Sequence, residues 1–177
     1  SLGSTAATTF EASIDVKELS TALLEAPEAT LTASGEARNL HDAENRAVDF
    51  TVTGRASNLG SNDAGFANAI GNRLALDAEG RWRVGQPVDI ASASVETDTL
   101  AARFAGSIGD NVSGTYSLDA QSLAAFSAIA NRELGGGITL KADGSVGFDG
   151  LFDLTLDATA TNLALGVDAA DGLLAGT

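Results

Sequence analysis

Few residues of this 177-residue chain could perform chemistry, and the first to consider is its single histidine. His41 precedes Asp42, a carboxylate that could orient the imidazole for proton transfer. The pair lies in a polar stretch at 39–44, and neither a nucleophilic serine elbow nor a second base accompanies it. We therefore expect a solvated loop histidine and not a catalytic base.

Paired carboxylates are the second candidate for chemistry. Asp153 and Asp157 lie on one face of an alternating segment, and Asp143 and Asp149 form a similar pair. Two carboxyl groups can catalyse glycoside hydrolysis, but rows of Asp more often solvate the outer face of a sheet. We expect no catalytic residue here, so the chain is predicted not to be an enzyme.

Bound metals, phosphates and cofactors have no clear motif either. The polar turn at 61–65 lacks the alternating ligands and the distal Glu of a calcium loop. The glycine triplet at 135–137 follows a helical pattern, which is the wrong context for a phosphate-binding loop. The chain has no cysteine, which removes disulfides and thiolate ligands. The sequence thus predicts no metal site and no cofactor.

Composition and charge exclude further classes of function. The 24 acidic and 10 basic residues give a net charge of -14, whereas nucleic-acid binding depends on Lys and Arg. A hydrophobic content of 44% is enough for one sizeable domain. No apolar run approaches the roughly 20 residues of a membrane-spanning helix. With neither an initiating Met nor a signal sequence, residues 1–177 are expected to be a single fragment of a longer repetitive domain.

An alternating pattern repeats along the chain and predicts the elements that position these residues. Every second residue is apolar or small, and the residues between are Thr, Ser, Asp or Arg. This period of two predicts strands with one apolar and one polar face. Six of the seven clearest segments carry a glycine in the apolar row; the seven are 29–37, 48–56, 74–82, 100–108, 112–120, 138–148 and 152–160. Residues 8–14 and 88–97 are expected to be strands as well.

Short amphipathic helices are expected between some of these strands. Capping patterns begin at Asp15, at Asp63, after Asp119 and at Asp168. The strands that start at residues 74 and 138, and the helix ends before them, share an offset of 64 (138 − 74), although the first unit keeps a different spacing. The resulting loose units are roughly 8–60, 61–118 and 119–168, with 169–177 starting a further unit.

The recurring glycines bear on the shape of the sheet. Glycine in an apolar row removes a side chain and permits a bulge, a bend or a close approach. The prediction is a mostly-β fold: a long, curled, antiparallel or mixed sheet with short interspersed amphipathic helices, repetitive and elongated. Its apolar face would line an open groove or, alternatively, pack as a closed core. The predicted lining is Phe50, Val52, Leu74, Leu76, Trp82, Phe104, Ile138, Leu140, Val146, Phe148, Leu154 and Leu156.

The strands and helices together resemble a known family. The segments Leu-Ala-Leu-Asp-Ala-Glu-Gly at 74–80 and Ile-Thr-Leu-Lys-Ala-Asp-Gly at 138–144, with the Leu-rich helix pattern at 122–126, are similar to the repetitive region of the TamB family. This family, the inner-membrane subunits of the translocation and assembly module, belongs to the AsmA-like superfamily. The resemblance covers nearly the whole chain and depends on the general pattern of many short strands, not on a signature of invariant residues. It implies a taco-like β-groove in the periplasmic part of an inner-membrane-anchored protein of a Gram-negative bacterium.

The same resemblance implies a function and partners. It implies phospholipid transport between the inner and outer membranes, and outer-membrane protein assembly with a TamA-like barrel partner. The groove would hold phospholipid acyl chains or nascent outer-membrane β-strands, and no catalytic residue is carried over. The alternative is a structural or adhesive β-repeat module of a secreted surface protein, whose apolar rows are simply its core. A closed lipocalin-like binding domain is a third possibility that the helices disfavour.

Overall fold

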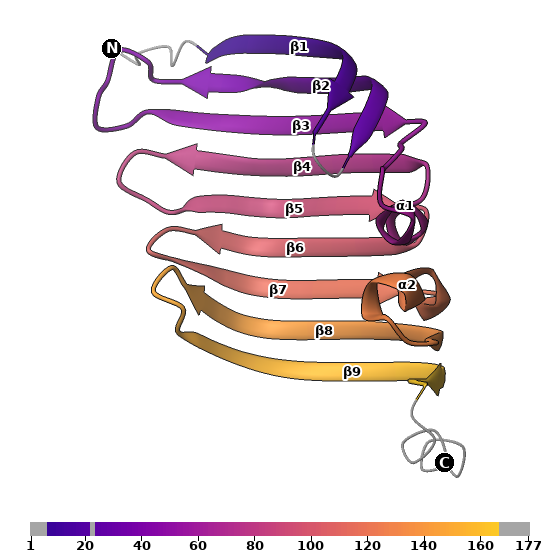
Figure 1. The fold of residues 1–177 in the computed structure, drawn as a ribbon. Helices are drawn as coiled ribbons and strands as arrows, with labels where there is room; N and C mark the ends of the chain where they lie inside the picture. Colours follow the sequence, from indigo (N-terminus) through magenta and orange to yellow (C-terminus); the bar gives the residue numbers. More distant parts are fainter. Residues whose placement is uncertain (1–6, 22–23, 167–177) are drawn as a thin grey trace.

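The chain folds into one antiparallel β-sheet of nine strands, seen in a computed structural model that describes residues 7–21 and 24–166. Each strand pairs with its neighbours in the sequence, so the strand order is β1 to β9 without a crossover (Figure 1). The strands are β1 (Ala7–Ser20), β2 (Glu25–Arg38), β3 (Ala47–Ser57), β4 (Arg73–Arg83), β5 (Val88–Thr97), β6 (Leu100–Ile108), β7 (Asn111–Ala120), β8 (Gly135–Gly147) and β9 (Phe152–Ala164).

This architecture confirms the predicted fold class: mostly β, with short helices and a sheet that does not close into a barrel. β1 and β9 lie at opposite edges of the sheet (Figure 1). Alternation of apolar with Thr, Ser and charged residues favours such a sheet, because successive side chains of a strand point to opposite faces. All nine predicted strand segments are found, including the one at 88–97.

Two short helical segments lie at one rim of the sheet (Figure 1). Helix α1 (Ala64–Ile70) joins β3 to β4, and the 3-10 helix η1 (Leu123–Phe126) continues into α2 (Ser127–Ala130) between β7 and β8. α1 packs against η1 and α2, although four strands separate them in the sequence. The two helical connections therefore precede the strands that share the 64-residue offset, as the sequence predicts.

The predicted helix starting at Asp15 is wrong, because β1 continues to Ser20. Asp15 pairs with Thr30 and Val16 with Ala29, so pairing along the longest hairpin outweighs the local capping pattern. The predicted helix start at Asp168 lies outside the described residues. Within those residues, no helix is long and apolar enough to cross a membrane.

The register places the apolar residues of all nine strands in continuous rows across one face. Directly paired residues share a face of the sheet, so each row can be followed from strand to strand. Three of these rows each contain one residue from every strand, in order from β1 to β9. The leucine row is Ile14, Leu31, Gly54, Leu76, Val95, Ala102, Leu118, Leu140 and Ala158, and the aromatic row is Ala12, Ala33, Val52, Ala78, Ala93, Phe104, Tyr116, Ala142 and Leu156. The glycine row is Phe10, Gly35, Phe50, Gly80, Ile90, Gly106, Gly114, Gly144 and Leu154.

A bulge in β5 keeps these rows continuous. Gly80 pairs with Ile90 while Glu79 pairs with Ser92, so Ala91 is an extra residue in β5. Because of the extra residue, even-numbered residues such as Ile90 point to the apolar face before the bulge, and odd-numbered residues such as Ala93 point to it after the bulge. This explains why residues 88–97 carry apolar residues at both odd and even positions.

Little of the apolar face is covered. In the described part of the chain, the substantial contacts between elements are those of neighbouring strands, those among the helices, and one between β8 and η1. Of the five buried apolar residues in the described part of the chain, Ala26, Leu59, Ala69 and Ala120 lie near the rim that carries the helices, and Ile90 lies in β5 opposite Gly80. Among the described residues, no large side chain is fully buried. The sheet is thus a single layer whose small core is mainly at one rim.

Candidate apolar groove

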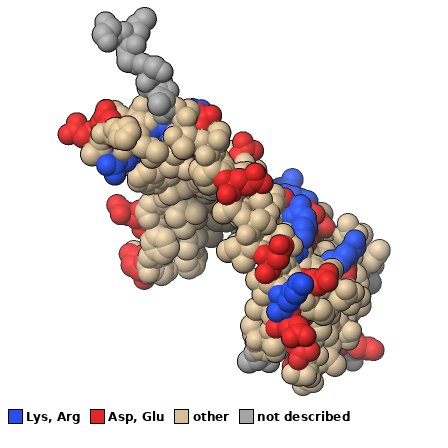
Figure 2. Space-filling view, turned by 90° about the horizontal axis from the view of Figure 1, so that it is seen from above, with Lys and Arg blue, Asp and Glu red and all other residues tan. Residues whose placement is uncertain are grey.

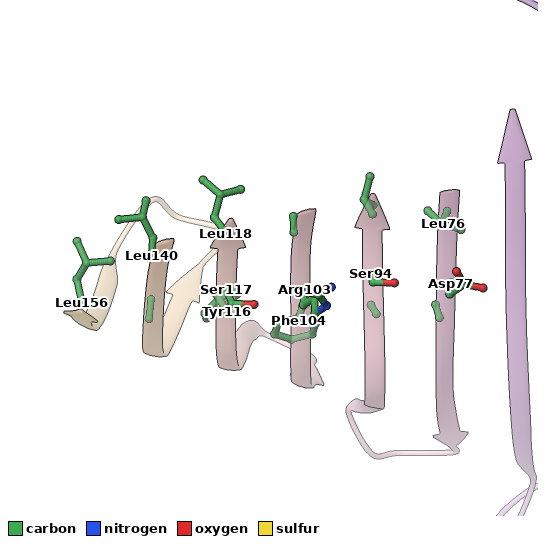
Figure 3. Close-up of a pocket in the computed structure, with 15 residues that line it drawn as sticks. Leu76, Asp77, Ser94, Arg103, Phe104, Tyr116, Ser117, Leu118, Leu140 and Leu156 are labelled. Carbon is green, nitrogen blue, oxygen red and sulfur yellow. The ribbon is translucent and has the colours of Figure 1, made fainter. Parts of the chain in front are cut away.

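An open cavity of about 470 Å³ lies on the apolar face of β4 to β9. The leucine and aromatic rows form its two sides, and the backbone between the rows forms its floor. Figure 3 shows Leu118, Leu140 and Leu156 on three neighbouring strands, with Phe104 and Tyr116 on the adjoining part of the wall. The groove therefore runs across the strands and not along them.

The size of the groove follows from the strand spacing. It extends from β4 to β9, which at about 4.8 Å between strands gives a length of about 24 Å. The molecule is bent when viewed along the stack of strands, with a hollow between two arms (Figure 2). An open trough of this length could accommodate an extended apolar chain.

The structure places eleven of the twelve predicted lining residues within strands on the apolar face. Leu76, Phe104, Leu140 and Leu156 line the groove itself. The other seven continue the same face beyond the cavity; they are Phe50, Val52, Leu74, Trp82, Ile138, Val146 and Leu154. Phe148 lies beyond the end of β8, in the turn to β9, where 74% of it is exposed.

Several groove residues were missing from the predicted lining. Tyr116 and Leu118 of β7 lie in the middle of the groove, and Val95 contributes from β5. The first two belong to the alternating segment 112–120, so the sequence pattern could have identified them. Val95 follows the β5 bulge, and its orientation is not predictable from alternation alone.

The opposite face carries the charges. Asp49 of β3 lies between Arg38 of β2 and Arg81 of β4 and forms an ion pair with each. The hydrogen bond from Arg81 is the main reason that the pKa of Asp49 is below its ordinary value, and the nearby positive charges add to the effect. Cross-strand pairs Arg55–Asp77 and Glu96–Arg103 continue this pattern. The sheet thus separates an ion-paired face from an apolar one.

Of the residues first considered for catalysis, His41 and Asp42 lie in the turn between β2 and β3, outside the groove. His41 is exposed in the turn between β2 and β3, and Asp42 accepts hydrogen bonds from the Asn45 side chain (2.8 Å) and the Glu44 backbone N–H (3.1 Å). These bonds lower the pKa of Asp42, the one from Asn45 most. Among the described residues, no group of three or more His, Asp or Glu side chains is placed to hold a metal ion.

Comparison with known proteins adds no relative: no family model, no curated protein and no solved structure matches the chain. The candidate site is therefore defined by its own geometry, a single-layer antiparallel sheet with an open apolar groove across six strands.

Proposed function

We propose that this chain is a non-enzymatic section of a periplasmic lipid-transport groove, of the kind its TamB-like sequence implies. The observation that supports this most is the open groove on the apolar face, which reaches the edge strand β9 and whose rows continue past it to the other edge, β1. A groove that is open along its length lets acyl chains enter while the headgroups stay in water. Transport of this kind needs no reaction and no fixed pocket.

The dimensions of the groove suit an acyl chain. Its length of about 24 Å exceeds the roughly 15 Å that one acyl chain spans in half of a bilayer core. Each methylene removed from water contributes about 0.8 kcal/mol, so a chain is held without any directional bond. Because Leu, Val and Ala recur from strand to strand in the leucine row, neighbouring positions are similar and the chain can slide between them.

The wider role proposed for the parent protein is outer-membrane biogenesis. A TamA-like barrel would be the partner of the parent protein, and nascent outer-membrane β-strands are the second possible cargo. The long edge strands β1 and β9, of 14 and 13 residues, offer backbone groups on which an extended segment could pair.

Site-specific photo-crosslinking tests the lipid groove. A photoreactive amino acid at Leu76 or Leu140, in the leucine row, should capture phospholipid in cells or from vesicles. Asp77 and Lys141 are the matched controls, because each is the next residue of the same strand and points to the opposite face. Phe50 and Thr51 form a third pair on β3, outside the cavity.

The expected result is lipid capture at Leu76, Leu140 and Phe50, with little or none at Asp77, Lys141 and Thr51. Capture only at the outward positions, or no capture at any position in the folded protein, would refute a lipid groove. In the latter case a structural or adhesive role for the sheet would be favoured.

A further inference from the structure

A hydrogen bond within β7 shows how the groove obtains its shape. The hydroxyl group of Tyr116 donates to the backbone carbonyl oxygen of Val112 at 2.8 Å. Four residues of a straight strand span about 13 Å, which is more than a tyrosine side chain and one hydrogen bond reach together. The bond can form only because β7 is bent between the two residues.

The bend lies at Gly114, the residue of the glycine row between Val112 and Tyr116. Gly114 has φ +153° and its partner Gly106 has φ +157°, a region of backbone conformation that other residues rarely adopt. A Cβ on Gly114 would lie 2.1 Å from the carbonyl oxygen of Ala105, so the neighbouring strand occupies the place of a side chain. The glycines permit the bend, and Tyr116 spans it on the apolar side.

Aromatic rings of adjacent strands lie close to two other glycines of this row. The ring of Phe10 would lie 2.7 Å from a Cβ on Gly35, and the ring of Phe50 would lie 2.7 Å from a Cβ on Gly80. Tyr116 also packs against Phe104 of β6, with ring centroids 5.0 Å apart and the rings tilted by 35°. These rings lie on the apolar side of the row, and those of Tyr116 and Phe104 form part of the groove wall.

We propose that Tyr116 is a strap that holds the apolar groove in its bent form and thereby sets how far the groove opens. Tyr116 is a positioning residue, which acts through the curvature of β7 and, by pairing, of its neighbours. The inference depends on the proposed function only for the ligand, because the bend itself requires no lipid. With the strap removed, β7 straightens at Gly114, and the parts of the sheet on either side of this bend move apart.

A distance measurement across β7 tests the strap. The chain has no cysteine, so spin labels can be placed on Asp110→Cys and Gln121→Cys, two exposed positions that flank β7. A straight strand between residues 110 and 121 would span about 36 Å at 3.3 Å per residue, and the bent strand is shorter. Tyr116→Phe removes only the hydroxyl group and is expected to shift the distance distribution toward the longer value.

Two further variants give the experiment its controls. Ser117→Ala removes a hydroxyl group from the next residue, on the opposite face, and should leave the distance unchanged. Gly114→Ala should lengthen the distance in the same direction as Tyr116→Phe, since residues other than glycine rarely adopt the φ of +153° found at the bend. If Tyr116→Phe unfolds cooperatively yet keeps the wild-type distance, Tyr116 is not a strap.

Lipid capture at Leu140 separates this inference from the proposed function. If both hold, Tyr116→Phe lengthens the distance and lowers the yield of lipid crosslinked at Leu140, while Ser117→Ala changes neither. If the distance shifts but wild-type protein captures no lipid, the strap stands and the lipid groove fails. If wild-type protein captures lipid and Tyr116→Phe changes neither quantity, the strap fails and the lipid groove stands.

Discussion

Asp98 shows how single residues hold the rim of this open sheet. Its carboxylate accepts hydrogen bonds from the backbone N–H of Asn72 (2.7 Å) and from Nε of Arg73 (2.8 Å), which joins the end of α1 to the turn between β5 and β6. Thr99 of the same turn donates to the carbonyl oxygen of Ala69 in α1. These contacts attach a helix of seven residues that could not be stable alone.

The hydrogen bonds to Asp98 predict a pH dependence of stability. The pKa of Asp98 is below the ordinary value of about 3.9, mainly because of the hydrogen bond from the backbone N–H of Asn72 and, to a smaller extent, the one from the Arg73 side chain. As the pH falls, Asp98 is therefore protonated in the unfolded chain before it is protonated in the folded protein. The stabilisation by the Asp98 carboxylate is complete above the unfolded pKa and is lost as the pH falls through the lower folded pKa. Asp98→Asn should lower the stability at neutral pH and flatten its loss below pH 4.

Urea denaturation at several pH values measures this effect. Asp110→Asn, which removes a carboxylate from the turn between β6 and β7, controls for the change in net charge. Equal stability of Asp98→Asn and wild-type protein at neutral pH would show that the contacts of Asp98 with α1 contribute nothing.

At the scale of the elements, the start of α1 makes a separate prediction. Asp63 is its N-cap, and Oδ1 accepts the backbone N–H of Phe66 at 2.9 Å. Asp63→Ala should reduce the free energy of unfolding by about 1 kcal/mol, because that N–H loses its partner. Asn62→Ala, one residue outside the cap, is the control in the same denaturation experiment. A variant as stable as the control would mean that α1 is held by its packing alone.

The elements also show what alternation can and cannot predict. The period of two identifies the strands, because it follows from side chains that point to opposite faces. It does not reveal that Asp15 to Ser20 prolongs β1, since a local capping pattern competes there with pairing to β2. Nor does it reveal the β5 bulge, which changes the parity of the apolar residues between Ile90 and Ala93.

The candidate site was predictable in kind but not in position. Apolar rows with glycines indicate a curved sheet, yet the alignment of Gly80, Gly106 and Gly114 in one row depends on the register of pairing between strands. The hydrogen bond from Tyr116 to Val112 follows from that curvature and has no signal in the sequence. The register, and not the composition, therefore decides which of the apolar residues line the groove.

At the scale of the whole molecule, stability must come mainly from pairing between strands. Nine strands share continuous ladders, whereas large apolar side chains such as Ile14 (57% exposed) and Leu156 (65% exposed) stay in contact with solvent. The six ion pairs found among the described residues lie between part-exposed side chains, where each contributes little. The sheet is thus held along its length by backbone hydrogen bonds, supported by a small core at the helix rim.

The exposed apolar face has a calorimetric consequence. The heat capacity change of unfolding reflects mainly apolar surface that becomes exposed, and typical globular proteins give about 12–15 cal/mol/K per residue. A sheet that leaves one apolar face in solvent buries less apolar surface on folding. Its heat capacity change of unfolding per residue should therefore fall below this range. A value within the range in differential scanning calorimetry would indicate that the face is covered in solution.

Ligand binding in the groove should then be detectable from heat capacity changes as well as from affinity. Burying the leucine and aromatic rows under an acyl chain makes the heat capacity of binding negative, and the complex should unfold with a larger heat capacity change than the empty protein. The empty protein should consequently have the flatter dependence of stability on temperature, and the ligand should restore the curvature that a closed core gives to other proteins.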